Sequence, residues 1–314
     1  TRRVAEGVFG DRVLGLTRVL KDISADVYIA HNIDTLLPAF RAAKGGAKVV
    51  FDCMEYYSDM GESQSTIEVR ATKMLEQQLL GRCALVIASS GRLSDTLADE
   101  YSVVPPFPSY NVPAIVRNLP GKRGGGLNLY WRNSVIGFGQ RGLQDAFIAL
   151  SQLPADVHLY IQGRLPLAGR SEIEGRAKAL GISNRISILP PYASQDAVEA
   201  AALYDIGLCL ERKGPRNHDL TVSNKMFDYH MAELAIVASD LPSLREVIVR
   251  SSGGLLYQPG SSDSLVSILR QLRDSPYMLE KMQQSARNFA LTEANLEKEL
   301  EQLSNALSNA LEEV

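Results

Sequence analysis

Two basic side chains stand near predicted helix starts in the part of the chain that follows residue 124. Arg141 lies in the turn GFGQRGL (137–143), between a predicted strand and a predicted helix, and Lys225 lies in SNKMFDY (223–229). Ser223 is placed to cap the second helix. A helix amino end carries about half a positive charge and exposed N–H groups, so a cation is unfavourable there unless an anion binds. Two such cations indicate one shared anion, and a diphosphate would satisfy both.

The neighbouring residues suit a nucleotide. Glycines let the backbone approach a phosphate, a helix start offers donors, and a carboxylate one turn into the helix suits ribose hydroxyls. The residues that we assign to this site are Gly139, Arg141, Gly142, Ser223, Asn224, Lys225 and Asp228. A purely structural interpretation stays open: a tight turn with an exposed Arg141, and a surface Asp228 paired with Lys225 or Lys213.

Short β-branched apolar segments alternate with amphipathic segments along most of the chain. Strands are predicted at 25–31, 47–53, 84–90, 113–118, 133–138, 156–163, 185–191, 204–210, 235–239 and 254–257. Helices are predicted from Asp34 to 43, from Ser63 or Ser65 to 81, and at 91–101, 142–153, 194–203, 261–274 and 276–314. This alternation is typical of parallel sheets covered by helices on both faces.

The segment LPGKRGGGLNLY (119–130) combines three consecutive glycines with basic residues and predicts a hinge. We therefore expect two doubly wound domains, 1–124 and 125–290, and a terminal helix, 291–314, that crosses back to the first domain. Open parallel sheets bind ligands at the carboxyl ends of their strands. Two such sheets facing across a cleft would hold a ligand between them.

Composition excludes several classes of function. The 314 residues include 33 basic and 36 acidic side chains, so the basic excess of a nucleic-acid binder is missing. No apolar run approaches the ~20 residues of a membrane span. The histidines lack ligand spacing, so no metal site is predicted. Cys53, Cys83 and Cys209 lie in or beside apolar segments, which predicts buried, reduced thiols in a cytoplasmic protein. Peripheral contact with an inner membrane face stays open.

Several segments resemble retaining nucleotide-sugar glycosyltransferases of family four, which have the two-domain GT-B fold. Residues 223–248 are similar to the NK-x-FEY…PVVASD-x-P-x-LREI signature, and 141–143 to the RGL element. Residues 192–210 resemble the strand-helix unit that ends in an A-D-x-x-L strand. In the amino-terminal half, 25–43 resembles ADVVHAHDLDTLLPA and 48–59 resembles VVYDSHEYY. The segments occur in the family's order.

The resemblance implies a UDP-sugar or GDP-sugar donor on the carboxy-terminal domain and a glycan, lipid-linked or small-molecule acceptor on the other. It implies sugar transfer with retention of configuration and no required cofactor or catalytic metal. Arg141 and Lys225 would stabilise the leaving diphosphate, and Asp228 would hold the ribose.

Residues after the first two strands would face the acceptor. They are the acceptor candidates His31, Asp34 and Tyr56, and Glu55 as a third catalytic residue beside the two cations. Alternatively, Asp34 caps a helix beside a partly buried His31, and the tyrosines only pack. The polar loop 211–218 is interpreted either as a lid over the donor site or as solvated chain.

Three departures weaken the resemblance at the site. Met54 stands where the family has a histidine, Leu220 stands where it has the first of two glutamates, and Asp228 replaces the second. The chain before residue 25 is also too short for the family's first strand and glycine loop, so we expect an amino-terminal domain that is short at its start. Two functions follow: an active glycosyltransferase, or a catalytically degenerate relative that serves as a partner or scaffold subunit.

Overall fold

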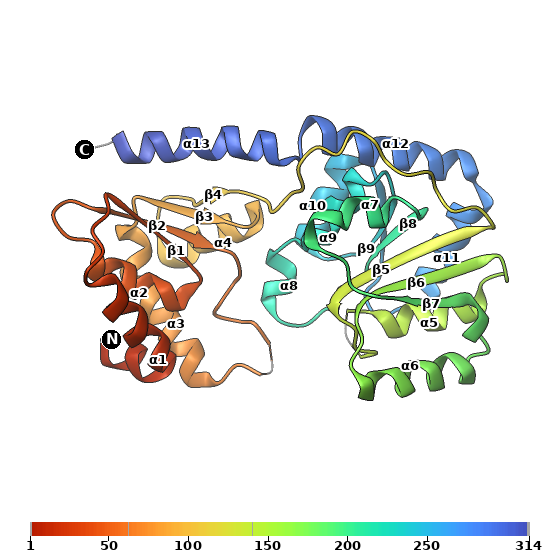
Figure 1. Ribbon diagram of the computed structural model, residues 1–314, viewed down its shortest axis with the longest axis horizontal. Helices are drawn as coiled ribbons and strands as arrows, with labels where there is room; N and C mark the ends of the chain where they lie inside the picture. The colour runs from red at the N-terminus through yellow and green to blue at the C-terminus, as the bar shows by residue number, and fades with distance from the viewer. Residues whose placement is uncertain (1, 62, 140, 313–314) are drawn as a thin grey trace. The chain divides into compact units, whose positions relative to one another are not determined.

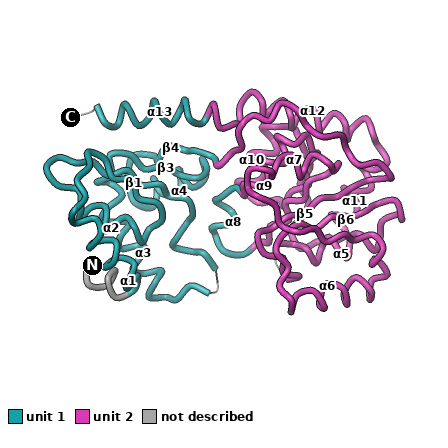
Figure 2. The backbone as a smooth tube through the Cα atoms, viewed as in Figure 1, with its two compact units in different colours: residues 1–110, 214–222, 299–314 teal, residues 111–213, 223–298 magenta. Residues whose placement is uncertain are grey.

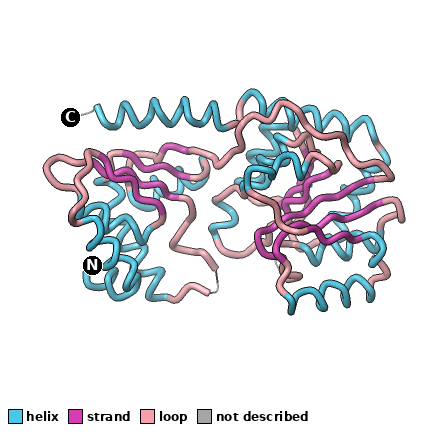
Figure 3. Tube along the Cα trace, viewed as in Figure 1, coloured by secondary structure: helices cyan, strands magenta, loops and turns pink. Residues whose placement is uncertain are grey.

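The computed structural model describes residues 2–61, 63–139 and 141–312 (Figure 1), so Gln140 of the predicted turn lies outside the described residues. The chain forms two compact units (Figure 2). Unit 1 contains residues 1–110, 214–222 and 299–314, and unit 2 contains 111–213 and 223–298. Each unit is an α/β structure built on one parallel sheet (Figure 3).

Unit 1 has the strand order β1-β2-β3-β4. Its strands are β1 (Val27–His31), β2 (Lys48–Cys53), β3 (Leu85–Ala88) and β4 (Phe107–Pro108). Its helices are α1 (Arg2–Leu20), α2 (Ile33–Ala42), α3 (Thr66–Leu79), η1 (Leu80–Arg82), α4 (Gly91–Tyr101), α8 (Arg216–Leu220) and most of α13 (Leu296–Glu312). The Lys48 ammonium donates to the carbonyls of Ala310 and Leu311, 3.1 and 2.8 Å away, which places a cation at the carboxyl end of α13.

Unit 2 has the strand order β10-β9-β8-β5-β6-β7, all parallel. Its strands are β5 (Leu127–Val135), β6 (Val157–Arg164), β7 (Ile186–Leu189), β8 (Ile206–Cys209), β9 (Ala235–Ser239) and β10 (Gly254–Tyr257). Its helices are α5 (Leu143–Gln152), α6 (Leu167–Ala179), η2 (Ser183–Arg185), η3 (Ser194–Asp196), α7 (Ala197–Ala201), α9 (Asn224–Met231), α10 (Pro242–Ser251), α11 (Ser262–Asp274) and α12 (Pro276–Thr292).

The connections of unit 2 reverse direction between β5 and β8. The chain proceeds from β5 to β6 and β7 on one side, then returns to β8 and continues to β9 and β10 on the other. Helices α5 and α11 pack together, as do α9 and α12. The carboxyl ends of β5 and β8 therefore border the crevice where open α/β sheets bind ligands.

Most predicted strands are confirmed, but three predictions near the middle of the chain are wrong. Of the predicted strand 133–138, only residues 133–135 lie in a strand, the end of β5. Residues 113–118, all of them described, form no strand. Instead, the Pro113 carbonyl accepts from the N–H of Leu296, and the N–H of Ile115 donates to the Glu297 carboxylate at 3.2 Å. These backbone groups bind the first turn of α13 rather than a sheet neighbour, and the short β4 forms the edge.

The predicted hinge at 119–130 is also wrong in its second half. Strand β5 begins at Leu127, because Tyr130 and Trp131 are fully buried and pair in the sheet. The glycines end just before it: Gly126 has φ +116° and lies so close to the Asp156 carbonyl that a Cβ there would meet it at 2.0 Å.

Helix starts were predicted with mixed success. Ser65 caps α3 with a reciprocal capping box to Glu68, as one of two predicted alternatives. Asp34 is not the cap of α2: Asn32 takes that position, and Asp34 lies in the first turn, 2.9 Å from the Arg12 guanidinium. Helix α1 lies in a segment for which the sequence analysis predicts no element. The predicted stretch 276–314 is two helices, α12 and α13.

The predictions about membranes, metals and thiols concern the whole chain. No helix among the described residues is long and apolar enough to cross a membrane. Nowhere in the described chain do three or more metal-ligating side chains of the types His, Cys, Asp and Glu gather. Cys53 and Cys209 are free and buried as predicted, and Cys83 is free but only partly buried.

Candidate anion-binding site

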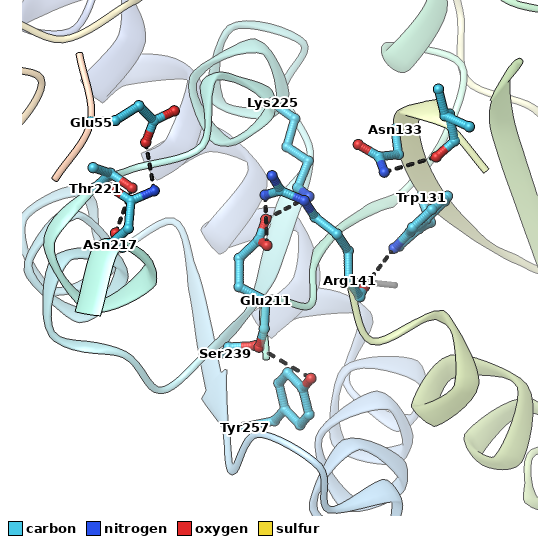
Figure 4. Close-up of polar contacts among 11 residues, drawn as sticks. Glu55, Trp131, Asn133, Arg141, Glu211, Asn217, Thr221, Lys225, Ser239 and Tyr257 are labelled. Atoms are coloured by element: carbon cyan, nitrogen blue, oxygen red, sulfur yellow. Dashed lines mark hydrogen bonds and ion pairs between the residues drawn. The ribbon is translucent and has the colours of Figure 1, made fainter. Parts of the chain in front are cut away.

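The two predicted cations of unit 2 come together in the structure. Arg141 Nη1 lies 2.7 Å from Oε2 of Glu211, and Lys225 Nζ lies 2.7 Å from Oε1 of the same carboxylate (Figure 4). The Lys225 and Glu211 side chains are only 6 % and 5 % exposed, whereas that of Arg141 is 39 % exposed. Two cations around one carboxylate leave a local excess of one positive charge, on the side where Arg141 reaches solvent.

The sheet positions these three side chains. Arg141 follows β5, and Glu211 lies two residues after β8, the neighbouring strand across the reversal point. Lys225 lies in the first turn of α9. The carboxyl ends of adjacent parallel strands and the start of a helix thus supply one site.

The turn that carries Arg141 is constrained by packing. Arg141 and Gly142 both have positive φ, 46° and 65°. A Cβ on Gly142 would lie 2.5 Å from the Leu210 carbonyl oxygen, so only glycine fits. The buried indole of Trp131 donates to the Arg141 carbonyl at 3.1 Å. The backbone of this residue is therefore fixed while its guanidinium reaches Glu211.

Glu211 is the residue that the sequence analysis missed as part of this site, because it was assigned only to the polar loop 211–218. Burial alone would raise its pKa, but the charges of Lys225 and Arg141 outweigh burial and lower the pKa to about 2. Its backbone carbonyl accepts from the Ser239 hydroxyl at 2.5 Å. A polar residue directly after a buried strand at the reversal point was the available signal.

Asp228 has a partner that neither interpretation anticipated. Its carboxylate accepts from Arg132, whose guanidinium also donates to the Tyr192 hydroxyl and lies over the Tyr229 ring, 6.0 Å from the centroid. Asp228 therefore pairs with Arg132 of β5, not with Lys225 or Lys213 as predicted. The structure holds the Asp228 side chain in a fixed orientation.

The other predicted donor residues are placed as follows. Ser223 occupies the N-cap position of α9, but within the described residues its side chain makes no capping hydrogen bond. Asn224 is the first residue of that helix and is exposed. Among the described atoms, none lies within 4 Å of a Cβ built on Gly139, so the backbone is open there.

Glu55 and Tyr56 of unit 1 meet α8 rather than a free edge. The Asn217 amide donates to the Glu55 carboxylate at 2.6 Å, and its oxygen accepts from the N–H of Tyr56 at 2.7 Å (Figure 4). Arg216 donates to the Tyr56 hydroxyl and to Glu100. Most of the segment interpreted as a lid or as solvated chain, residues 214–218, is thus bound to unit 1.

His31 and Asp52 form a second polar pair in unit 1. They are register partners at the carboxyl ends of β1 and β2, and His31 Nδ1 lies 2.7 Å from the Asp52 carboxylate. The His31 side chain is 61 % exposed, so the interpretation of a partly buried histidine is wrong. Asp34 turns to Arg12 instead.

Two of the three departures from the family pattern, Met54 and Leu220, lie in unit 1. Leu220 is buried in the core cluster of unit 1 that also contains Tyr56 and Leu93. Met54 is 42 % exposed directly before Glu55. An apolar side chain suits the position of Leu220 because α8 packs onto the core there.

The chain was compared with known proteins at three levels. No family model matches it, and no curated protein does. Solved structures do match: HepE of Anabaena in complex with UDP has a TM-score of 0.76 and 17 % identity over 95 % of this chain and 82 % of its own. A glycosyltransferase from Rickettsia africae has a TM-score of 0.77 and 13 % identity over 98 % and 83 %. Sucrose-phosphate synthase from Thermosynechococcus elongatus has 0.72 and 12 % over 98 % and 79 %.

At these identities the similarity concerns the fold. The matches span nearly the whole chain, and both units carry the all-parallel sheet predicted for them. The protein has the GT-B fold, two Rossmann-like α/β units in one chain.

Proposed function

We propose that this protein is a glycosyltransferase that takes a sugar from a nucleoside diphosphate donor. The observation that carries the proposal is the convergence of Arg141 and Lys225 on one point at the reversal of the unit 2 sheet. The donor set consists of Gly139, Arg141, Gly142, Ser223, Asn224, Lys225 and Asp228. UDP-sugars and GDP-sugars are the proposed donors. HepE has been crystallised with UDP and with UDP-glucose, which supports the uridine nucleotide.

In the proposed reaction, the bond between the anomeric carbon and the diphosphate oxygen breaks, and the acceptor oxygen forms the new bond with retention of configuration. The acceptor proton passes to the departing phosphate. Arg141 and Lys225 stabilise the charge that develops on the leaving group. Arg132 holds Asp228 for the ribose hydroxyls. Retention and the absence of a metal requirement rest on the resemblance to family four.

Unit 1 is the proposed acceptor side. Polar groups at the carboxyl ends of its strands can bind hydroxyls: exposed His31 with its Asp52 partner, and Glu55, which Asn217 orients as a catalytic residue beside Tyr56. Asp34 is a weaker acceptor candidate because its carboxylate is paired with Arg12. The acceptor is a glycan, a lipid-linked sugar or a small molecule, and the proposed place of action is the cytoplasm or the inner face of a membrane.

The alternative function is a catalytically degenerate partner subunit. Leu220 favours it, because the side chain at the position of the family's first glutamate is apolar and buried in unit 1. Exposed Met54 at the family's histidine position favours it as well.

Calorimetric titration with UDP, GDP and ADP tests the donor proposal, and slow hydrolysis of the matching nucleotide sugar tests catalysis. We expect one of UDP and GDP to bind with a Kd well below millimolar. Absence of binding by all three nucleotides would overturn the donor proposal. Binding without any hydrolysis or transfer would favour the degenerate partner.

A further inference from the structure

The two cations proposed for the diphosphate already share a carboxylate that nothing in the donor chemistry requires. Glu211 binds both of them, one per oxygen, each at 2.7 Å. Its side chain is 5 % exposed, and the Ser239 hydroxyl fixes its backbone carbonyl. The carboxylate therefore stays in place when a ligand arrives.

N–H donors remain on the same cations. A lysine ammonium has three N–H donors and an arginine guanidinium has five. Each uses one nitrogen on Glu211, Nζ of Lys225 and Nη1 of Arg141. A diphosphate can thus bind the remaining donors while Glu211 keeps its contacts, and it then lies within a few ångströms of a fixed negative charge.

Charge separates the proposed donor from its product. A nucleotide sugar carries one negative charge on each phosphate. A free nucleoside diphosphate gains a third charge above pH ~6, where a terminal phosphate loses its second proton. Arg141, Lys225 and Glu211 together supply only one net positive charge, which suits the less charged ligand.

We propose that Glu211 sets the charge preference of the donor site, so that the nucleotide sugar binds well relative to the more highly charged nucleoside diphosphate that the reaction leaves behind. The inference rests on the proposed function and adds a specificity residue to it. Its consequence is faster release of the product, since a third negative charge would otherwise be held by both cations.

The experiment compares the Kd of UDP with that of UDP-glucose, or the GDP pair if guanine is preferred, in the wild type and in Glu211→Gln. The amide keeps an acceptor oxygen but removes the charge. We expect Glu211→Gln to tighten UDP relative to the nucleotide sugar by at least about tenfold, which corresponds to ~1.4 kcal/mol. The control Asp156→Asn removes a carboxylate just before β6, at the amino end of that strand and therefore at the opposite end of the sheet from the site, and leaves the ratio unchanged.

An unchanged ratio in Glu211→Gln would overturn the inference, whether both ligands bind more weakly or neither changes. Failure of the wild type to bind any of these nucleotides would instead overturn the proposed function. The two failures are therefore distinguishable.

A second measurement uses only the wild type, in case Glu211→Gln does not fold. UDP and its methyl ester, which lacks the second ionisation, are titrated at pH 5 and pH 7.5. With Glu211 in place, the third charge should improve UDP binding by less than about threefold relative to the ester. A relative gain above about tenfold would contradict the proposed role.

Discussion

Arg141 and Lys225 stand at the amino ends of two different helices and bind opposite oxygens of a single buried carboxylate. Only Arg141 extends to solvent from this cluster, with a side chain 39 % exposed. The dipole of the following helix does not stabilise a cation in this position. The positive charge is therefore available to stabilise a bound anion.

Replacing the exposed cation should therefore affect ligand binding more than stability. We expect Arg141→Gln to weaken UDP or GDP about ten- to hundredfold, the loss of one or two charge-assisted hydrogen bonds. Thermal unfolding should stay near the wild-type temperature. The control Arg170→Gln neutralises an exposed arginine on α6 that pairs with Glu174. Equal affinities for the nucleotide in wild type and Arg141→Gln would remove Arg141 from the donor site.

Two glycines of the same turn differ in what they tolerate. Gly142→Ala should destabilise unit 2 and abolish nucleotide binding, because the new Cβ would lie 2.5 Å from the Leu210 carbonyl oxygen at φ +65°. Gly139→Ala should leave the unfolding temperature unchanged, since the described atoms leave a Cβ there free of contacts within 4 Å. Differential scanning fluorimetry of the two variants checks this contrast, and similar melting of both would contradict the geometry of the turn.

Glu76 should make unit 1 less stable as the pH rises. Burial raises its pKa to about 7, against hydrogen bonds from Tyr101 and Ser58 that lower it. A carboxyl whose folded pKa lies above the unfolded value stabilises the fold below pH ~4.5 and loses that contribution as the pH rises through about 7. The free energy of unfolding of Glu76→Gln should therefore exceed that of the wild type by up to about 3 kcal/mol at pH 8. At pH 4.5 this difference should disappear.

Urea unfolding at pH 4.5 and pH 8 measures the difference. Asp99→Asn, which changes an exposed carboxyl on α4, serves as the control and should show the wild-type dependence on pH. A Glu76→Gln variant with the same stability as the wild type at both pH values would show that this carboxyl is not the source.

Asn217 should attach α8 to unit 1 through two separable hydrogen bonds. Asn217→Ala removes both hydrogen bonds and should lower the free energy of unfolding by about 2–4 kcal/mol, since it leaves the buried N–H of Tyr56 without an acceptor. Asn217→Asp keeps that acceptor but places a carboxylate against Glu55. Hydrogen exchange of the Tyr56 amide should accelerate in Asn217→Ala and stay slow in Asn217→Asp. The control Lys213→Gln changes an exposed residue just before α8. It should neither lower the free energy of unfolding nor accelerate exchange of the Tyr56 amide.

The fold was largely predictable, because buried parallel strands are short and uniformly apolar. The segments that became β8 and β9 illustrate this, because every residue in each is buried. The errors fell where tertiary contacts decide. Residues 113–118 look like a strand but form hydrogen bonds with the first turn of α13. The strand β5 starts directly after glycines because Tyr130 and Trp131 are buried in the core.

The candidate site was predictable only in part. The positions of Arg141 and Lys225 conflict with the helix dipole, and such a conflict is visible in a sequence. The carboxylate that joins them could not be recognised in the sequence. Glu211 is separated from both residues along the chain and contacts them only because of the strand order. The pairing of Asp228 with Arg132 was missed for the same reason.

Unit 1 is assembled from separated pieces of chain, since residues 214–222 and 299–314 belong to it together with 1–110. During synthesis, the amino-terminal piece leaves the ribosome long before α8 and α13 exist. Until then Tyr56 lacks its amide acceptor on α8, and the Lys48 ammonium lacks the carbonyls of α13. Completion of unit 1 therefore waits for residues 214–222 and 299–314, and a gene cut after residue 110 would leave unit 1 without either helix.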